Sequence, residues 1–186
     1  MSSKREQLIN TATKLYAERG YHATGIDTIL AESGIAKKTL YNHFRKKEEL
    51  ILAVLRQQDG EFRNYFMRQV ETQAQNPKDR LLAIFDVAEQ WFSQKNFFGC
   101  MFINAIGEYS GKDTPIRDAC REYKKLMRDY IQSLAEDAGA SDPTALADEL
   151  ALLLEGAIVT AQVSERIESA KTAKKIAKML IADAID

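Results

Sequence analysis

The chain has 186 residues, 45% of them hydrophobic, and its 26 basic and 27 acidic side chains give a formal net charge of −1 at pH 7. This length supports one or two packed domains, and the apolar content is ample for a core. The balanced charge excludes a polybasic chain as a whole. Only three prolines and nine glycines are present, which argues against a loop-rich fold.

No segment of the sequence directs the chain to a membrane or to an oxidising compartment. The first residues are amphipathic and charged, without the apolar centre of a signal peptide. The longest apolar run, over residues 150–159, is interrupted by Glu155 and Gly156 and is too short to cross a bilayer. Cys100 and Cys120 are too few for a disulfide scaffold and lack metal-site spacing. We therefore expect a cytoplasmic protein with no metal or cofactor.

Residues 24–50 carry the most informative pattern, that of two short helices joined by a tight turn. The first helix has apolar residues three and four positions apart, as a core-facing helix requires: Ile26, Ile29 and Leu30. Thr24 stands where a capping hydroxyl is expected. Gly34 can take the left-handed conformation that ends a helix, and Ile35 is expected to fill the corner.

A second helix is expected from Lys37, with Leu40 and Phe44 spaced to dock on the first helix. Its outer faces carry polar and basic residues, namely Lys37, Lys38, Thr39, Tyr41, Asn42 and His43. Such side chains suit phosphates and base edges. Residues 1–50 hold nine Lys/Arg against six Asp/Glu, whereas the remainder holds 17 against 21. Positive charge therefore coincides with a pattern typical of a DNA-binding helix-turn-helix.

About a dozen spaced positions resemble those of the tetracycline-repressor family of bacterial transcription regulators. The matching residues are Ala12, Leu15, Tyr16, Gly20, Tyr21, Thr24, the run Ser33-Gly34-Ile35 and the run from Leu40 to Leu50. A motif of this length is far more specific than a lone helix-turn-helix match. Gly25 departs from the pattern where a second hydroxyl residue is common. Ala36 departs where a capping serine is common, so the first N–H groups of the second helix stay open to a phosphate.

The resemblance implies an all-α fold of about nine helices, with a helix-turn-helix DNA-binding domain over residues 1–46 and a helical effector-binding and dimerisation domain over residues 47–186. After residue 46, helix patterns and their terminators predict six helices, over about 47–75, 77–93, 99–109, 114–138, 144–163 and 168–185. Gly60 is expected to weaken or bend the first of these.

Aromatic and thioether residues in the middle of the chain suit either an ordinary core or an apolar ligand pocket. Our candidate lining residues are Phe62, Phe66, Phe85, Trp91, Cys100, Met101, Asn104, Glu108, Tyr123 and Met127. Asn104 and Glu108 form an i, i+4 pair on an otherwise apolar helix, so they either bond to neighbouring helices or contact a ligand. Cys100 is either a buried inert thiol or a redox- or electrophile-sensing one. The surrounding segment resembles a GCxFxNAxxE stretch of one subgroup of these regulators.

The last two predicted helices carry more apolar surface than one subunit needs, which favours self-association. We expect the dimer interface to include Leu153, Ala157, Ala161, Ile176 and Leu180. The resemblance implies a four-helix bundle built from these two helices of each subunit. Such a dimer has the two-fold symmetry that a palindromic operator requires.

We interpret the chain as a homodimeric DNA-binding regulator, a repressor released from its operator by a small-molecule effector. The expected DNA contacts are Lys37, Lys38 and Asn42 to bases, Thr24, Tyr41, His43 and Lys47 to phosphates, and Thr39. Two alternatives are a redox-responsive regulator acting through Cys100, and a helical enzyme or interaction module without an effector. Both histidines fall in the DNA-binding segment and no catalytic, metal or phosphate-loop signature is evident, so we expect no enzyme activity.

Overall fold

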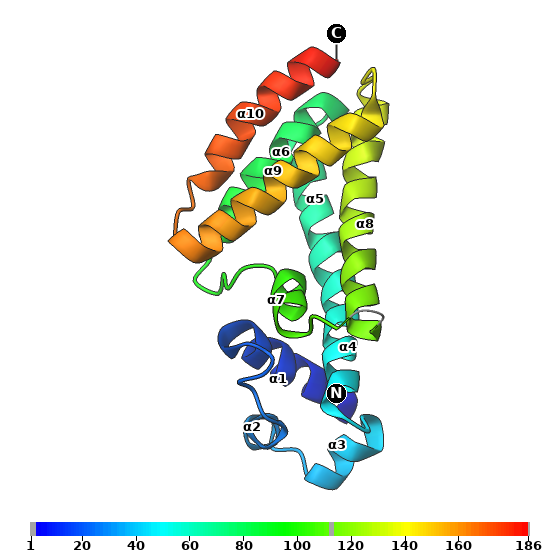
Figure 1. Cartoon of the computed structure of the whole chain (residues 1–186), viewed down its shortest axis with the longest axis vertical. Helices are drawn as coiled ribbons and strands as arrows, with labels where there is room; N and C mark the ends of the chain where they lie inside the picture. Colours follow the sequence, from blue (N-terminus) through cyan, green and yellow to red (C-terminus); the bar gives the residue numbers. More distant parts are fainter. Residues whose placement is uncertain (1–2, 112–113, 186) are drawn as a thin grey trace. The chain divides into compact units, whose positions relative to one another are not determined.

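The structure is a computed structural model that describes residues 3–111 and 114–185. All regular elements in these ranges are helices, so the predicted all-α class is confirmed (Figure 1). The α-helices are α1 (Lys4–Arg19), α2 (Ile26–Ser33), α3 (Lys37–His43), α4 (Lys47–Gln58), α5 (Asn64–Gln73), α6 (Pro77–Phe92), α7 (Met101–Glu108), α8 (Pro115–Asp137), α9 (Pro143–Ser164) and α10 (Ser169–Ala184), and a π-helical turn, η1 (Asp59–Arg63), joins α4 to α5. None of these helices is long and apolar enough to cross a membrane.

Helix starts and interruptions follow the chemistry of particular residues. Asn76 caps α6, because its side chain accepts the Asp79 N–H at 2.9 Å and Pro77 occupies the first helical position. The long helix predicted from Lys47 contains a π-helical turn that includes Gly60. This confirms the weak point expected there, since glycine has low helix propensity and π-turns interrupt the regular ladder of hydrogen bonds.

The chain forms two compact units, each with its own core. The first unit comprises Met1–Glu61 and Cys100–Tyr123, and the second comprises Phe62–Gly99 and Lys124–Asp186. The first unit therefore includes α4, α7 and the start of α8 beside α1 to α3, which is more than the predicted DNA-binding domain.

In the first unit, α1 packs against α2, α3 and α4. The core residues from these helices include Leu8, Ala12, Leu15, Ile29, Leu40, Leu50 and Val54, all buried. Full burial of one such large aliphatic side chain contributes about 1.5–3 kcal/mol. That contribution allows the short α2 and α3 to exist, because isolated helices of eight and seven residues are unstable in water.

In the second unit, α6 lies against α5, α9 and α10, and α9 packs along α10. The α6 residues Leu81, Ile84, Phe85 and Ala88 are at most 1% exposed and form the centre of this core. The Asp86 carboxylate on the same helix accepts two hydrogen bonds from the Lys174 ammonium of α10, at 2.7 and 2.6 Å. Apolar packing and a half-buried ion pair thus hold α10 on α6.

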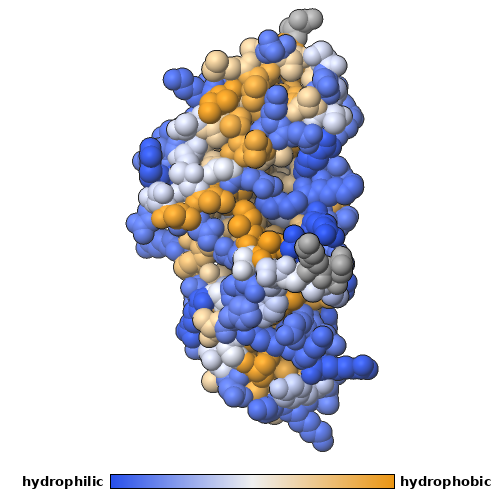
Figure 2. Space-filling model, viewed as in Figure 1, coloured by the Kyte–Doolittle hydropathy of each residue, from blue (hydrophilic) through white to orange (hydrophobic). Residues whose placement is uncertain are grey.

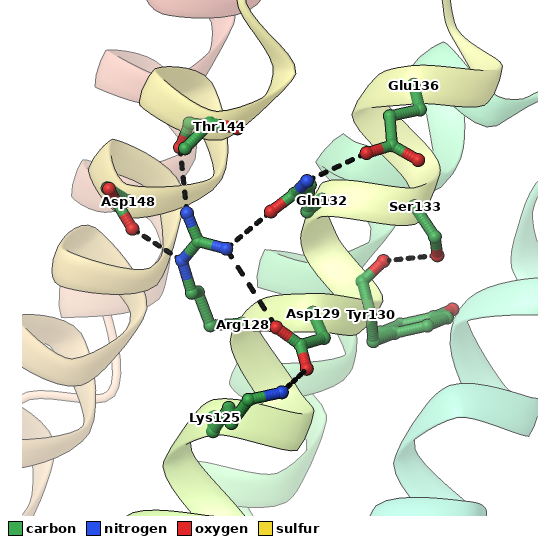
Figure 3. Close-up of polar contacts among 9 residues, drawn as sticks. All are labelled: Lys125, Arg128, Asp129, Tyr130, Gln132, Ser133, Glu136, Thr144 and Asp148. Atoms are coloured by element: carbon green, nitrogen blue, oxygen red, sulfur yellow. Dashed lines mark hydrogen bonds and ion pairs between the residues drawn. The ribbon is translucent and has the colours of Figure 1, made fainter.

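A guanidinium group joins the middle of α8 to the start of α9 (Figure 3). Arg128 Nε donates to Asp148 Oδ1 at 2.6 Å, and Nη2 donates to the Thr144 carbonyl at 3.3 Å. Nη1 donates to Gln132, whose amide in turn donates to Glu136. The hydrogen bond from Arg128 holds the pKa of Asp148 below its usual value. Arg128 is 27% and Asp148 63% exposed, so solvent screens this ion pair and it adds little to the stability of the fold.

Gly99 ends the connection between α6 and α7 in a conformation that other residues avoid. Its φ is +82°, and a Cβ added there would overlap the Gln162 side chain of α9. We expect Gly99→Ala to lower the free energy of unfolding by about 1–2 kcal/mol, since the left-handed backbone penalises any L side chain. The measurement is urea unfolding of the full chain, with Gly107→Ala as control. Gly107 has no atom within 4 Å of an added Cβ, so an equal loss in that variant would contradict the explanation.

Candidate nucleic-acid interface

The turn between α2 and α3 has the geometry that the sequence predicts. Gly34 ends α2 in the left-handed conformation, with φ +65° and its N–H donating to the Leu30 carbonyl at 3.0 Å. Ile35 follows and is buried at the corner. Gln7 of α1 donates to the Ser33 carbonyl at 2.9 Å, which ties the turn to α1. Three interactions therefore hold the turn: the backbone hydrogen bond of Gly34, the burial of Ile35 and the hydrogen bond from Gln7 of α1.

Helix α3 buries one face and exposes the other, as expected. Leu40 is fully buried and Phe44, directly after the helix, is 3% exposed. The exposed side chains are Lys37, Lys38, Tyr41, Asn42 and His43, while Thr39 is half-buried. A short helix thus presents two ammonium groups, an amide, a phenol and an imidazole to solvent. This is the side-chain set used for contacts with phosphates and base edges.

The amino end of α3 has no side-chain cap. Ala36 occupies the cap position and offers no side-chain acceptor to the first N–H groups, as its sequence position predicts. Lys37, the first helical residue, reaches Asp27 of α2 at 3.4 Å. Both side chains are more than 60% exposed, so this pair contributes about 0–1 kcal/mol and leaves Lys37 free to turn toward another anion.

Thr24 does not play either of the roles expected for it. The cap position of α2 is Gly25, so the predicted threonine cap is wrong. The Thr24 side chain is 0% exposed, and its hydroxyl donates to the Gly20 carbonyl at 2.8 Å and the Leu15 carbonyl at 3.3 Å. A buried hydroxyl that closes the connection between α1 and α2 cannot touch DNA. We therefore remove the Thr24 side chain from the expected contacts.

Lys47 begins α4 and is half-buried. Partial burial lowers the pKa of Lys47, and the carboxylates of Glu108 and Glu48 oppose that shift. The ammonium group therefore lies in the field of two acidic side chains within the first unit. Like Lys37 with Asp27, Lys47 is therefore an expected DNA contact whose charge the protein already partly balances.

Glu108, the last residue of α7, binds the connection between α1 and α2. Its carboxylate accepts the backbone N–H of Tyr21 at 2.8 Å and that of His22 at 2.5 Å. His22 Nε2 lies 2.9 Å from the Glu108 carbonyl, and the imidazole stacks on Tyr109 at 4.7 Å between ring centroids. Glu108 was expected either to bond to neighbouring helices or to contact a ligand. The structure shows that its carboxylate accepts hydrogen bonds from the connection between α1 and α2. Sequence reasoning missed the partner because 86 and 87 residues separate the two sides.

The ten candidate pocket residues are divided between the two units. Cys100, Met101, Asn104, Glu108 and Tyr123 belong to the first unit, and Phe62, Phe66, Phe85, Trp91 and Met127 belong to the second. Tyr123 in the first unit and Phe62, Phe66 and Trp91 in the second contact other aromatic rings. Phe102 stacks on Tyr123 at 3.7 Å, and Phe62 lies 4.6 Å from Trp91. Cys100 and Cys120 are buried free thiols.

A surface hollow of about 360 Å³ lies in the first unit and uses none of these ten residues. It is lined by Leu55, Arg56, Asp59, Pro115, Asp118, Ala119 and Glu122. Three carboxylates and one guanidinium make it polar. Among the described residues, no group of three or more His, Cys, Asp and Glu side chains could hold a metal ion.

The expected dimer residues differ in exposure. Ala157 and Ala161 are each 4% exposed and lie inside the second unit, so they are unavailable to a partner and their assignment is corrected. Leu153 and Leu180 are half-buried, and Ile176 is 42% exposed. The strongly exposed apolar side chains nearby are Leu152, Val163 and Met179, at 74%, 76% and 68%. Hydrophobic side chains gather on the face formed by α9 and α10 (Figure 2).

Comparison with known proteins identifies the class to which this fold and interface belong. The family model described as bacterial regulatory proteins, tetR family, matches residues 8–54. A second model, described as a tetracyclin repressor-like C-terminal domain, matches residues 77–177. The chain therefore belongs to the TetR family of transcription regulators, which are DNA-binding proteins and not enzymes.

Particular relatives support the family assignment over most of the chain. The regulator LmrA of Bacillus subtilis is 29% identical over 147 residues, covering 76% of each protein. The transcriptional activator FasR of Mycolicibacterium smegmatis is 48% identical over 52 residues, but this match spans 28% of the chain and only 24% of that activator. The crystal structure of SCO4454, a TetR-family regulator from Streptomyces coelicolor, superposes with a TM-score of 0.90 at 27% identity and covers 98% of this chain and 96% of that one.

A substitution at Thr24 tests whether its buried hydroxyl stabilises the fold and makes no contact with DNA. We expect Thr24→Val to lower the free energy of unfolding by about 1–3 kcal/mol, because two buried carbonyl groups lose their donor. The salt dependence of DNA binding should not change, since no phosphate contact is lost. Thr28→Val on α2 is the matched control. A Thr24→Val protein of normal stability with a reduced salt slope would restore Thr24 as a DNA contact.

Proposed function

We propose that the chain is a homodimeric repressor that binds a palindromic DNA operator through α3 and is released by a small-molecule effector. The observation that carries the proposal is the exposed face of α3, where five polar or basic side chains stand on a helix anchored by buried apolar residues. DNA-binding is a property of the family, whereas the sign of regulation, the partner and the effector are our proposals.

The distribution of side chains on α3 supports specific roles in DNA binding. Lys37, Lys38 and Asn42 have the donors and acceptors that discriminate base edges in the major groove. Tyr41 and His43, also exposed, suit phosphate oxygens, and Lys47 suits one at the start of α4. Thr39 is half-buried, and we propose that its hydroxyl makes a further contact with the DNA. The uncapped N–H groups that follow Ala36 offer a further anion contact.

Alanine substitution of the α3 lysines tests the DNA-binding face. We expect Lys37→Ala and Lys38→Ala to weaken operator binding, and the one that holds a phosphate to lower the slope of log K against log salt by about one. The operator is first selected by the wild-type protein from a randomised duplex library. Affinities are then measured between ~50 and ~200 mM salt. Lys95→Ala, at an exposed position of the second unit, is the control, and unchanged binding in both α3 variants would refute the assignment.

The apolar face of α9 and α10 supports the homodimer. Leu152, Val159 and Val163 follow one side of α9 at helical spacing, and Ile176 and Met179 do the same on α10. Exposed aliphatic side chains in one continuous area are characteristic of an interface. A second copy related by two-fold symmetry would cover this face and would supply a second α3 for the second half-site of a palindrome.

A charge placed on this face should separate the subunits. We expect Val163→Glu to give monomers in sedimentation, because pairing would bury an uncompensated carboxylate. The fold should survive, since the Val163 side chain is 76% exposed. Thr72→Glu, at an exposed position of α5, is the control. Ala161→Arg would instead disturb packing inside the subunit, and a Val163→Glu protein that still sediments as a dimer would place the interface elsewhere.

Release by an effector follows from linkage. A molecule that binds better to the conformation with lower operator affinity must weaken DNA binding by the same factor, typically 5- to 150-fold. Thermal-shift screening finds such molecules by the stability they add. The redox alternative has less support, because Cys100 and Cys120 are at most 4% exposed and buried structural thiols are unreactive.

A further inference from the structure

Tyr21 is held at both ends by the same helix of the first unit. Its backbone N–H donates to the Glu108 carboxylate at the last residue of α7, at 2.8 Å. Its hydroxyl donates to the carbonyl of Met101, the first residue of α7, at 3.0 Å. The side chain is 0% exposed and contacts the rings of Tyr16 and Tyr109. A single residue between α1 and α2 therefore spans the length of α7.

The Glu108 contacts are the strong kind of hydrogen bond. A carboxylate that accepts two consecutive backbone N–H groups forms charge-assisted bonds, which are worth more than neutral ones. The neighbouring His22 adds a ring stack on Tyr109 and a contact from Nε2 to the Glu108 carbonyl. Within the part of the chain that the structure describes, no other group accepts a hydrogen bond from these two N–H groups.

The segment that Glu108 holds determines where α2 begins. Tyr21 and His22 lie between Gly20, which ends α1 with φ +84°, and Thr24, whose hydroxyl binds back to the Gly20 carbonyl at 2.8 Å. Helix α2 starts two residues after Thr24, and the tight turn at Gly34 then fixes α3 to α2. A displacement of Tyr21 and His22 therefore moves the base of the helix-turn-helix.

We propose that Glu108 is a positioning residue for sequence-specific DNA binding. Through Tyr21 and His22 it holds the connection between α1 and α2 in the arrangement that lets α2 and α3 fit a DNA half-site. Glu108 does not contact DNA in this assignment. The inference rests on the proposed function, because it concerns the same DNA-binding face, and it names a residue of α7 that this face requires.

Glu108→Gln tests the role with the smallest change of shape. The amide keeps one acceptor oxygen but sets an NH₂ group against the other N–H. We expect affinity for the selected operator to fall about 10- to 100-fold, the range for losing a hydrogen bond to a charged group. Affinity for a scrambled duplex and the salt slope should stay unchanged, since the phosphate-binding residues remain. Amide hydrogen exchange at Tyr21 and His22 should become faster.

Two further variants keep the inference falsifiable. Tyr21→Phe removes only the hydroxyl that donates to Met101, and we expect it to lower specific binding in the same direction by a smaller factor. Glu18→Gln, the same chemical change at an exposed position of α1, should behave as wild type. The folded fraction is checked by circular dichroism and melting temperature, and affinities are compared per folded molecule.

The outcomes separate this inference from the proposed function. If the wild-type protein selects an operator and the ratio of specific to scrambled binding is unchanged in Glu108→Gln and Tyr21→Phe, Glu108 is structural only and the inference is overturned. Equal losses for both duplexes would also overturn it, since a positioning role predicts loss of specificity alone. Failure of the wild-type protein to select any sequence would instead contradict the proposed function.

Discussion

The DNA-binding face depends on the burial of a few apolar side chains beneath a helix that is too short to be stable alone. Helix α3 has seven residues, well below the length at which an isolated helix persists in water. Ile35, Leu40 and Phe44 hold it against the core of the first unit. Because these three residues supply most of the packing, the exposed positions of α3 are free to carry polar groups.

Two different interactions then place this short helix relative to the rest of the first unit. The turn at Gly34 fixes α3 to α2, and Gln7 ties that turn to α1. The base of α2 depends instead on Glu108 of α7, which belongs to the same compact unit as α1 to α4. An element far along the sequence thus becomes part of the DNA-binding structure. In a ligand-responsive protein, such an element is a physical route by which a change elsewhere can reach the DNA-binding face.

Local patterns in the sequence were sufficient to predict most helices and the exposed face of α3. Their boundaries are set by residues whose effects are local, such as Asn76 before Pro77, Gly34 after α2 and Gly60 within the long helix. Thr24 was assigned wrongly because a hydroxyl before a helix can cap it or turn inward. Only the tertiary position of the Gly20 carbonyl decides between these options.

Other features could not be predicted because they depend on contacts between distant segments. Glu108 was recognised as an unusual polar residue, but its partners lie near residue 21 and no local signal connects them. On α9, apolar residues occupy nearly every side of the helix, so periodicity could not separate the side facing α6 and α10 from the exposed side. The structure shows that Ala157 and Ala161 face inward and that Leu152 and Val163 face outward.

Hydrogen–deuterium exchange on the full chain with its selected duplex tests directly whether the exposed face of α3 contacts DNA. We expect new protection in residues 35–47 when the selected duplex is added, and weaker protection there with a scrambled duplex. Exposed segments of the second unit, such as residues 93–97, should exchange at the same rate in both states. Protection confined to the second unit, with none over residues 35–47, would show that DNA binds elsewhere than on α3.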